Sequence, residues 1–323
     1  MTLQDNINLQ IIIGNQNNPY LNLAVESQLL DDHLENTISF FLWKNRQTVV
    51  IGANQNPYSE CDVDALLSEG GHLARRRTGG GAVFHDLGNL NFSFIADKKI
   101  YDVKRQMTVI QKALLNFGLE TEVSGRNDIT YKDRKFSGNA FAKTKSQGLH
   151  HGTLLIKTDG EKLQKYLKVK PAKLHKHGVK SVSSRVINLS EVADVTSENI
   201  VPHLIKSFED VYENKATVVN FDDLCTDKVL NLRDYIGSEE YIFGKWKNFR
   251  TKKSASFDWG SVDIDLDIDE DKGIIKNIEI ASDSLEPTAI KAAIELLKGA
   301  SINNKPVFTE DNIIVKDIIE MIY

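Results

Sequence analysis

The sequence predicts an α+β protein, with a large mixed-sheet domain over residues 1–240 and a small α+β domain over residues 241–323. Three observations lead to this prediction. Runs rich in β-branched and aromatic residues dominate the first half, with helical patterns between them. The last part contains a strictly alternating strand followed by well-delimited helices. A chain of 323 residues is also longer than a single domain with one hydrophobic core usually is.

The first half of the chain supplies most of the expected strands. A helix is predicted from Pro19 through 22–30, where Leu and Val residues form an apolar stripe between polar positions. Strands are predicted at 38–43 and 48–52, since both runs are rich in β-branched and aromatic residues and end at turn-forming residues. Further strands are expected at 82–84, 90–95 and 152–156, and further helices at 103–117 and 198–214.

The last part of the chain has a different pattern. Residues 220–234 form a polar stretch that we interpret as the approach to a second unit, with a domain boundary at 240. Between 262 and 269, apolar residues alternate strictly with four aspartates, which is typical of a strand with one solvated face. Residues 273–280 are expected as its hairpin partner. Helices are predicted from Pro287, with Gly299 as the stop, and from Glu310 to Met321.

Composition and charge exclude several classes of protein. Hydrophobic residues make up 41% and charged residues 26% of the chain, so wholesale disorder is disfavoured. The 40 basic and 45 acidic residues give a net charge of -5, which leaves no global basic field for nucleic acid or anionic membrane. No apolar run approaches the roughly 18 residues that span a bilayer. We therefore expect neither nucleic acid nor membrane as a partner.

Cysteine usage suggests a reducing compartment. Cys61 and Cys225 are the only two cysteines, and they lie far apart without metal-ligand spacing. The first twenty residues contain no Lys or Arg. We therefore expect neither a secretory signal peptide, which has a basic n-region, nor an Arg-rich transit peptide. A cytoplasmic location is the expectation.

The most unusual segment is 74–86, where three arginines lead into three glycines and then an apolar strand. Its chemistry suits a polyphosphate, because glycines let backbone N–H groups approach a phosphate and arginines supply forked, permanently charged donors. A flexible hairpin turn beside a solvated basic patch is an equally open interpretation. Neither a Walker A sequence nor a Gly-x-Gly-x2-Gly fingerprint after a strand is present, which disfavours P-loop and Rossmann sites.

A second polar cluster spans 124–129, 134–140 and 150–154. Asn127 and Asp128 could hold a hard cation or a ribose, and the ammonium of Lys135 could contact a phosphate or carboxylate oxygen. Alternatively, this is a polar hairpin whose Asn-Asp and Lys-Asp pairs simply form turns.

Taken together, the two clusters resemble the signature blocks of lipoate-protein ligases. The resemblance continues through 178–186, and 257–260 and 282–285 are similar to the accessory domain of the long, bacterial-type ligases. The expected large domain is therefore of the type shared by biotin and lipoate ligases. The blocks, in chain order, are WKNRQTVVIGANQNPYSEC, RRRTGGGAVFHDLGN, SGRNDI, RKFSGNAFAKTK and LHHGTLL.

The resemblance implies an ATP-dependent enzyme with two half-reactions. Lipoate attacks the α-phosphorus of ATP to give lipoyl-AMP and pyrophosphate, and an acceptor lysine then attacks the mixed anhydride to form an amide. Octanoate is the alternative acyl substrate. The implied acceptors are apo lipoyl domains of 2-oxoacid dehydrogenase E2 subunits or the glycine-cleavage H protein, and Mg²⁺ is expected with ATP.

The resemblance also assigns roles to individual residues. Lys135 is the expected catalytic residue, bridging the lipoate carboxylate and the α-phosphate, and Arg76 matches the family arginine that grips phosphate. Asp128 is the expected anchor for Mg²⁺. Ala142 stands where some relatives have an arginine. The nucleotide and the acyl group would be lined by Thr78, Gly79, Gly80, Gly81, Ala82, Val83, Phe84, Asn127, His151 and Thr153.

Two other hypotheses remain open at this point. One is an ATP-independent octanoyl or lipoyl transferase with a thioester on Cys61, although a small buried residue is the commoner role for such a cysteine. The other is a non-catalytic regulator that binds an acyl group or a nucleotide. The intact region around Lys135 and the C-terminal domain favour the ligase. The resemblance also suggests that this domain closes over the site as a lid.

Overall fold

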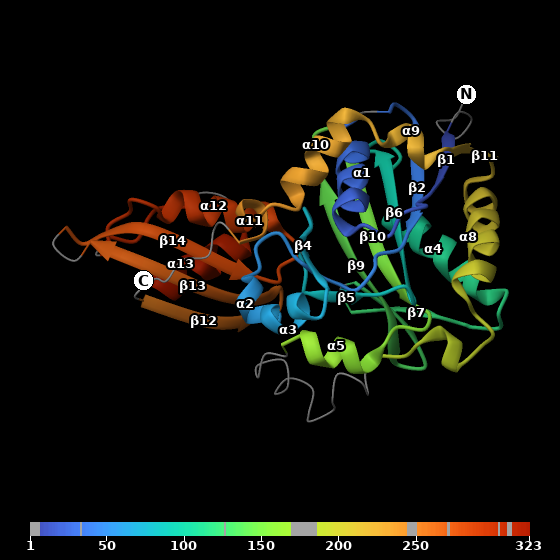
Figure 1. The fold of residues 1–323 in the computed structure, drawn as a ribbon. Coiled ribbons are helices and arrows are strands. Elements are labelled where there is room, and N and C mark those ends of the chain that lie inside the picture. Colours follow the sequence, from blue (N-terminus) through green and yellow to red (C-terminus); the bar gives the residue numbers. More distant parts are fainter. Residues whose placement is uncertain are drawn as a thin grey trace.

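The computed structural model describes residues 7–32, 34–125, 127–168, 186–243, 251–269, 272–302, 304–308 and 312–323. A large part built on a mixed sheet lies beside a small part with its own sheet and two helices (Figure 1). The predicted α+β class, with a large mixed sheet and a small C-terminal α+β part, is confirmed. Segment 178–186, which the sequence analysis included in the resemblance to lipoate-protein ligases, lies outside the described residues except for its last residue.

The large sheet has eight strands in the order β11-β1-β2-β6-β10-β9-β8-β7. Strand β1 runs parallel to both β2 and β11, whereas the remaining neighbours in the sheet are antiparallel, so the sheet is mixed. The strands are β1 (Asn8–Ile13), β2 (Thr37–Trp43), β6 (Asn89–Asp97), β7 (Glu122–Ser124), β8 (Asp128–Tyr131), β9 (Arg134–Lys143), β10 (Gln147–Leu155) and β11 (Ala216–Val219).

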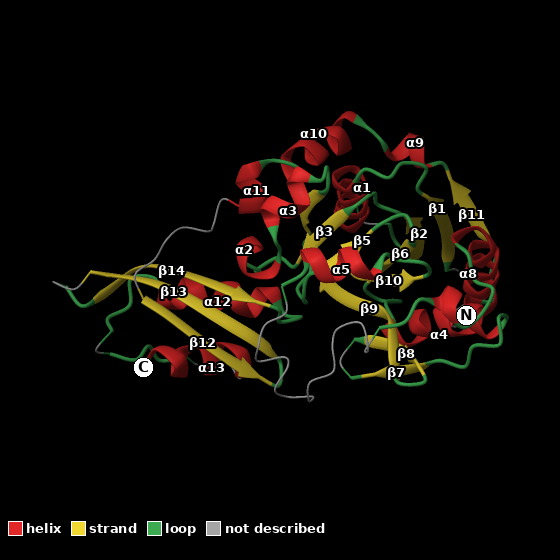
Figure 2. Cartoon of the chain, turned by 60° about the horizontal axis from the view of Figure 1, so that its bottom comes forward, coloured by secondary structure: helices red, strands yellow, loops and turns green. Residues whose placement is uncertain are grey.

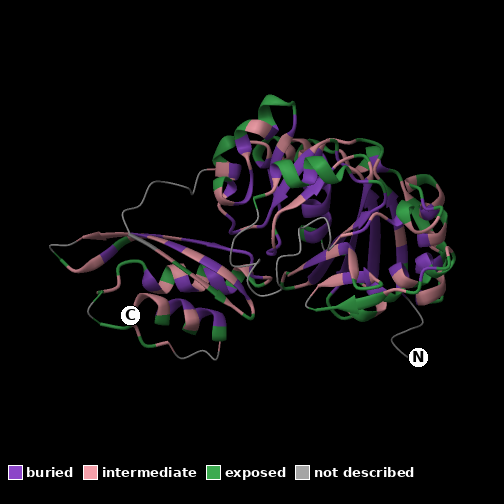
Figure 3. Ribbon diagram, turned by 90° about the horizontal axis from the view of Figure 1, so that it is seen from below, coloured by how far each residue is buried: buried purple, intermediate pink, exposed green. Residues whose placement is uncertain are grey.

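Helices cover both faces of this sheet. On one face, α4 (Val103–Leu115) and α8 (Ser197–Tyr212) pack with Phe40 and the other residues of β2 that share its side. On the other face, Phe41 and Trp43 pack with α1 (Pro19–Asp31) and α10 (Asp227–Ile236). Every residue of β2 is therefore buried. Figure 3 shows the buried strands between helices whose outer faces are exposed.

Helix α1 differs from the expected amphipathic helix with a solvated polar side. It is buried from Leu21 to Leu30, and its polar residues Asn22 and Glu26 lie in the interior. The reason is that the sheet covers one side of α1 and α10 covers another, so its polar residues are bonded internally. The expectation of a polar solvated side was wrong.

A second, three-stranded sheet leads toward the small part of the molecule (Figure 2). Its order is β4-β3-β5, and it packs with short helices around a core that includes Tyr166. The elements are β3 (Thr48–Ile51), β4 (His72–Arg75), β5 (Val83–His85), α2 (Pro57–Glu60), α3 (Val63–Ser68) and α5 (Gly160–Tyr166), with a short 3-10 turn later at Leu189–Glu191.

The polar stretch 220–234 is helical and belongs to the large part. It forms α9 (Phe221–Leu224) and α10, whose apolar residues pack in the same core as α1. Helix α11 (Glu239–Phe243) follows, with Ile242 in the core around the second sheet. The sequence analysis did not predict these helices, because the periodic Val229 and Ile236 stand among polar residues. The interpretation of 220–234 as the approach to a second unit stays a prediction. The boundary at 240 stays a prediction.

The small part has the alternating strand that the sequence predicted. In β13 (Gly260–Asp269), Val262, Ile264 and Leu266 are buried between partly exposed residues. Its core contains residues from 257 onward, whereas the other three clusters contain residues up to 243. The remaining elements are β12 (Thr251–Phe257), which the sequence analysis missed, β14 (Ile274–Ser282), α12 (Pro287–Leu297) and α13 (Ile313–Ile322).

Two other findings concern the helices. The predicted start of the last helix at Glu310 lies outside the described residues. Every described helix is too short or too polar to cross a lipid bilayer.

Candidate active site

Lys135 and Asp128 face each other across the β8–β9 hairpin. The turn holds Lys132 and Asp133 at φ values of 47° and 63°, which is the geometry of a tight hairpin turn. Nζ of Lys135 lies 2.7 Å from Oδ1 of Asp128, and both side chains are about one-third exposed (36% and 37%). The hairpin therefore presents an ammonium and a carboxylate at a surface that a substrate can reach.

Space for the ammonium is provided by a glycine. A Cβ added at Gly138 would lie 2.9 Å from Nζ of Lys135. The N–H of Gly138 donates to Oγ1 of Thr153 at 3.2 Å. Thr153 and His151 lie two residues apart on β10, which places their side chains on one face of the sheet at about 7 Å spacing. The structure thus brings Lys135, Asp128, Thr153 and His151 to one region.

Asn127 takes part in a reciprocal pair with the neighbouring strand. Its Nδ2 donates to the backbone carbonyl of Asn139, and Nδ2 of Asn139 donates to the carbonyl of Asn127 at 3.0 Å. Oδ1 of Asn139 lies 3.0 Å from Nε2 of His150, which is fully buried. This pair anchors the segment just before Asp128 to the sheet.

Residues 76–81, which we call the glycine loop, enclose the side chain of Arg76. One N–H from Nε, one from Nη1 and two from Nη2 donate to Oγ1 of Thr78 and to the carbonyls of Val50, Gly79 and Gly81, at 2.7 to 3.1 Å. Its guanidinium is buried, which lowers the pKa of Arg76 to about 10 and leaves it charged at neutral pH. In this structure Arg76 holds the loop in shape, so a phosphate contact by Arg76 stays a prediction.

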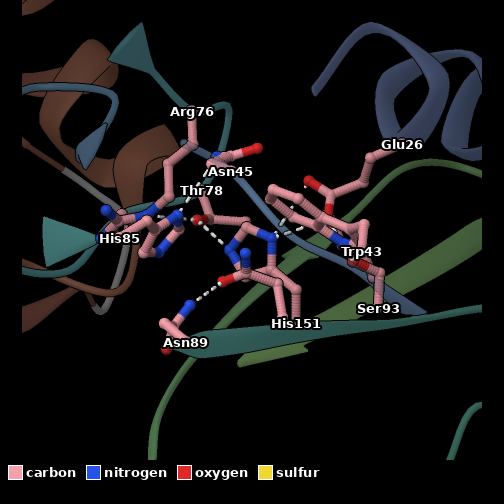
Figure 4. A network of polar contacts seen from close by, with 12 residues as sticks. Glu26, Trp43, Asn45, Arg76, Thr78, His85, Asn89, Ser93 and His151 are labelled. Atoms are coloured by element: carbon pink, nitrogen blue, oxygen red, sulfur yellow. Dashed lines mark hydrogen bonds and ion pairs between the residues drawn. The ribbon is translucent and has the colours of Figure 1, made fainter. Parts of the chain in front are cut away.

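A buried polar network connects this loop to helix α1 (Figure 4). Oγ1 of Thr78 lies 2.8 Å from Nε2 of His151, and Nδ1 of His151 lies 2.8 Å from Oε2 of Glu26. Oε2 of Glu26 also accepts from Ser93, whose Oγ accepts from Nε1 of Trp43 at 3.0 Å. The network fixes the His151 ring between this loop and helix α1.

Sequence reasoning missed several members of this network. Glu26 stood in the sequence as one polar position of an apparent amphipathic helix, and Ser93 as a strand residue. Trp43 opened a signature block, but no role was assigned to it. The available signal for Glu26 was a charged residue with Leu23, Leu29 and Leu30 at helical spacing around it.

The small part contacts the glycine loop through the segment after β14. The N–H of Gly80 donates to the carbonyl of Ser284 at 2.9 Å, and the N–H of Ser282 donates to the carbonyl of Asn54 at 2.9 Å. A Cβ at Gly79 would lie only 1.9 Å from the Ser284 oxygen. Glycine at position 79 is therefore required for this close approach, and Gly79 and Gly80 form part of the contact between the large and the small part.

Cys61 lies away from these groups in a hydrophobic core with Leu66 and Tyr166. It is fully buried, and burial raises the pKa of its thiol to about 12. A thiolate nucleophile at neutral pH is therefore disfavoured at this position.

The donor set suits Mg²⁺ only with help from a substrate. In the described ranges, no group of three or more His, Cys, Asp or Glu side chains could hold a metal ion. Mg²⁺ is commonly bound by one or two carboxylates together with substrate phosphates and water. The carboxylate of Asp128, which is about one-third exposed, fits that pattern.

Two buried histidines predict a pH dependence of stability. Burial lowers the pKa of both His85 and His150 to about 3, so both stay neutral in the fold. In the unfolded chain they bind protons below about pH 6.5. The unfolding free energy should thus fall as pH drops from 6.5 to 5, by up to about 1.4 kcal/mol per pH unit for each histidine.

Urea unfolding across this pH range measures the slope. Replacing His150 with Gln should reduce the slope, whatever it does to the absolute stability. An unchanged slope in His150→Gln would show that His150 gains its proton equally in both states.

Comparison with known proteins identifies the family. The model described as the lipoyl protein ligase A/B catalytic domain matches residues 18–209, and the bacterial lipoate protein ligase C-terminus matches residues 247–311. Lipoate-protein ligase A of Bdellovibrio bacteriovorus is 40% identical over 299 residues, which are 90% of this chain and 88% of that protein.

Solved structures agree. P. falciparum LipL1 in complex with lipoate has a TM-score of 0.83 at 31% identity, over 97% of this chain and 98% of that one. Lipoate-protein ligase A bound with ATP has a TM-score of 0.62 at 25% identity, over 74% of this chain and 98% of that one. The resemblance seen in the signature blocks is confirmed: this chain belongs to the lipoyl protein ligase A/B family, in the form that carries the bacterial C-terminal domain.

Proposed function

We propose that this protein is an ATP-dependent lipoate-protein ligase that acts through lipoyl-AMP. The lipoate carboxylate attacks the α-phosphorus of ATP and pyrophosphate leaves. An acceptor lysine amine then attacks the acyl carbon of the mixed anhydride, AMP leaves, and an amide is formed. The observation that carries this proposal is the Lys135–Asp128 pair at 2.7 Å beside Gly138, in a chain of this family.

Lys135 is proposed to bring the two anionic reactants together. A carboxylate that attacks a triphosphate meets charge repulsion, and the phosphorus gains negative oxygens as the bond forms. A fixed ammonium beside both groups lowers that barrier without reorganisation. Glycine at position 138 leaves room for the Lys135 side chain, so that Nζ can lie beside Asp128.

Asp128 is proposed to hold Mg²⁺ when ATP is bound. The ion would neutralise charge on the phosphate oxygens. In the structure the carboxylate of Asp128 pairs with the ammonium of Lys135 and positions it. When ATP is bound, the same carboxylate would also contact the Mg²⁺ ion. Asn127, anchored to β9, keeps the carboxylate in place.

The lipoyl-adenylate would lie over the shared face of β6 and β10. His151 and Thr153 lie on this face opposite Ser93 and Asn91. The glycine loop borders this face of the sheet, since Thr78 is hydrogen-bonded to His151. In this assignment the lining comprises Arg76, Thr78, Gly79, Gly80, Gly81, Ala82, Val83, Phe84, Asn127, His151 and Thr153.

The acceptor and the setting of the enzyme are also proposals. We place apo lipoyl domains of E2 subunits or the glycine-cleavage H protein as acceptors, and lipoate, with octanoate as the alternative, as the acyl substrate. We divide the chain into a catalytic domain (1–240) and an accessory domain (241–323). The cytoplasm is the proposed location, in keeping with two unpaired cysteines.

The proposal is tested by incubating the full chain with ATP, Mg²⁺, lipoate and an apo glycine-cleavage H protein or apo E2 lipoyl domain. The expected result is a mass increase of the acceptor by one lipoyl group, together with release of pyrophosphate. Omission of ATP should abolish both signals. Acyl transfer that proceeds from a thioester donor without ATP would contradict the ligase assignment.

Cysteine variants distinguish the ligase from a thioester transferase. Cys61→Ser and Cys225→Ser should both keep lipoyl transfer within about twofold of the parent, because an acyl phosphate anhydride needs no sulfur nucleophile. The same acceptor mass assay measures this. Loss of transfer in Cys61→Ser, with an acyl-enzyme trapped in the parent, would favour the transferase.

A further inference from the structure

A chain of three polar side chains crosses the core on the α4 face of the large sheet. Gln106 of α4, His150 of β10 and Asn139 of β9 are all at most 3% exposed. The surroundings are apolar, and the rings of Phe92 and Phe94 have centroids 5.5 and 5.8 Å from that of His150. Polar groups in such a core cost stability unless each is hydrogen-bonded, so these three residues need a reason other than packing.

The amide of Asn139 is oriented by the neighbouring strand. Its Nδ2 donates to the backbone carbonyl of Asn127 at 3.0 Å, since a carbonyl oxygen can only accept. Oδ1 of the same amide therefore faces Nε2 of His150 at 3.0 Å and must accept. A glycine leaves the room for this amide, because a Cβ at Gly152 would collide with Oδ1 of Asn139.

The ring of His150 consequently carries its proton on Nε2. Burial lowers the pKa of His150 to about 3, so the ring is neutral and Nδ1 has a lone pair that must accept. Nδ1 lies 3.0 Å from Oε1 of Gln106, whereas Nε2 of Gln106 is buried without a hydrogen-bond partner among the described residues. A half-turn of the Gln106 amide satisfies both groups, because Nε2 then donates to Nδ1. Donation thus runs from Gln106 through His150 to Asn139.

The end of this polar chain lies at the strand that carries the proposed metal ligand. The carbonyl of Asn127 accepts from the backbone N–H of Asn139 at 2.9 Å as well as from its Nδ2. Asp128 follows directly, pairs with Gly138 on β9, and places Oδ1 2.7 Å from Nζ of Lys135. The pairing of β8 with β9 shifts register just beyond this point, so the strand ladder alone constrains this end of β8 weakly.

We propose that Gln106, His150 and Asn139 are positioning residues that hold segment 127–128, so that the carboxylate of Asp128 is in place for the Mg²⁺ ion that accompanies ATP. The inference rests on the ligase function and on the metal role of Asp128 proposed above. Removal of groups that hold a metal ligand through hydrogen bonds typically lowers metal affinity by about 10- to 100-fold. All three residues are buried, so they act through Asp128 and not by contact with a substrate.

The first test determines the tautomer of His150 in the full chain without any ligand. Two-bond ¹H–¹⁵N spectra of protein labelled at its histidines distinguish a ring protonated on Nε2 from one protonated on Nδ1. The His150→Gln variant identifies the His150 signals by their loss. The expected result near neutral pH is a neutral ring with its proton on Nε2. A proton on Nδ1 would overturn the inference, because Asn139 would then have nothing to accept from the ring.

The second test compares variants in lipoyl-AMP formation. His150→Met removes both ring nitrogens and should raise the Mg²⁺ concentration at half-maximal rate by about tenfold, at the lower end of the range because it acts through segment 127–128. The kcat at saturating Mg²⁺ should stay within about threefold of the parent, since the metal then restores the site. His150→Gln keeps an amide N–H near the position of Nε2 and should retain the parental Mg²⁺ requirement.

Phe94→Leu is the matched control in the same core. It removes part of a ring that packs against His150 and should lower the unfolding midpoint, but it leaves the polar chain intact and should keep the parental Mg²⁺ requirement. Gln106→Met removes only the donor to Nδ1. It should shift the requirement in the same direction by about threefold, and it replaces His150→Met in the comparison if that variant does not fold.

Binding without turnover gives a readout that is independent of activity. ATP is titrated calorimetrically into the lipoate-free protein with and without Mg²⁺. Mg²⁺ should strengthen ATP binding in the parent, in His150→Gln and in Phe94→Leu, and about tenfold less in His150→Met. The affinity for ATP without Mg²⁺ should be the same in all four proteins.

The outcomes separate this inference from the function itself. A parent enzyme that forms no lipoyl-AMP would refute the proposed function, while the His150 tautomer and the effect of Mg²⁺ on ATP binding would still test the polar chain. A folded His150→Met variant with the parental Mg²⁺ requirement would overturn the inference. An equal shift in Phe94→Leu, or equal shifts in His150→Gln and His150→Met, would also overturn it, since the effect would then follow from core packing alone.

Discussion

Replacing Lys135 with alanine should lower the rate of lipoyl-AMP formation by about 100- to 1,000-fold and leave the fold intact. The loss is expected because Nζ is the ammonium proposed at the reacting carboxylate and phosphate. The fold should tolerate the change because the Lys135 side chain and its ion-pair partner Asp128 are both about one-third exposed. The backbone of Lys135 keeps its bond from the N–H of Ile187.

Pyrophosphate release from ATP and lipoate measures this step directly. Lys132→Ala is a matched control, because Lys132 lies on the same hairpin and its Nζ is placed over the Tyr131 ring. The control should release pyrophosphate at the parental rate. Near-normal release from Lys135→Ala, with an unchanged unfolding midpoint, would remove Lys135 from the mechanism.

The hairpin that carries Lys135 was accessible from sequence because its pattern is local. Polar turn residues stand between two short runs, and the Asn127-Asp128 and Lys135 blocks then follow at fixed spacing. The alternating strand at 262–268 was predictable for the same reason, since a period of two needs no information from elsewhere in the chain. In both cases the local pattern and the tertiary packing demand the same conformation.

The buried network could not be predicted in this way. Glu26 bonds to His151 from 125 residues away, and Asn22 reaches Asn45 across 23 residues. A polar residue on a helix is normally expected to face solvent, whereas Glu26 faces the sheet and bonds there to Ser93 and His151. The tautomer of His150 likewise depends on contacts that exist only after folding. What the sequence lacked was the identity of the partners.

The last prediction concerns the C-terminal domain. Deleting residues 245–323 should lower adenylation from lipoate and ATP by as much as about 100-fold, because the segment 282–287 would no longer contact the glycine loop. Transfer from preformed lipoyl-AMP to an apo acceptor should survive, since that step must admit a whole protein domain to the anhydride. The remaining chain should fold, because its three hydrophobic clusters contain residues up to 243.

A single substitution tests the same contact in the full chain. Gly79→Ala would place a Cβ 1.9 Å from the carbonyl oxygen of Ser284, so the contact must open, whereas Gly118→Ala at a helix end meets no atom within 4 Å and serves as a control for a glycine change elsewhere. Because Gly118 has a φ of 73°, its alanine variant reports strain without steric contact. Slow adenylation with intact transfer in Gly79→Ala would reproduce the deletion and support a lid. Full-rate adenylation by the folded truncated enzyme would instead assign the domain to acceptor binding, because closure over the site would then contribute nothing to the first step.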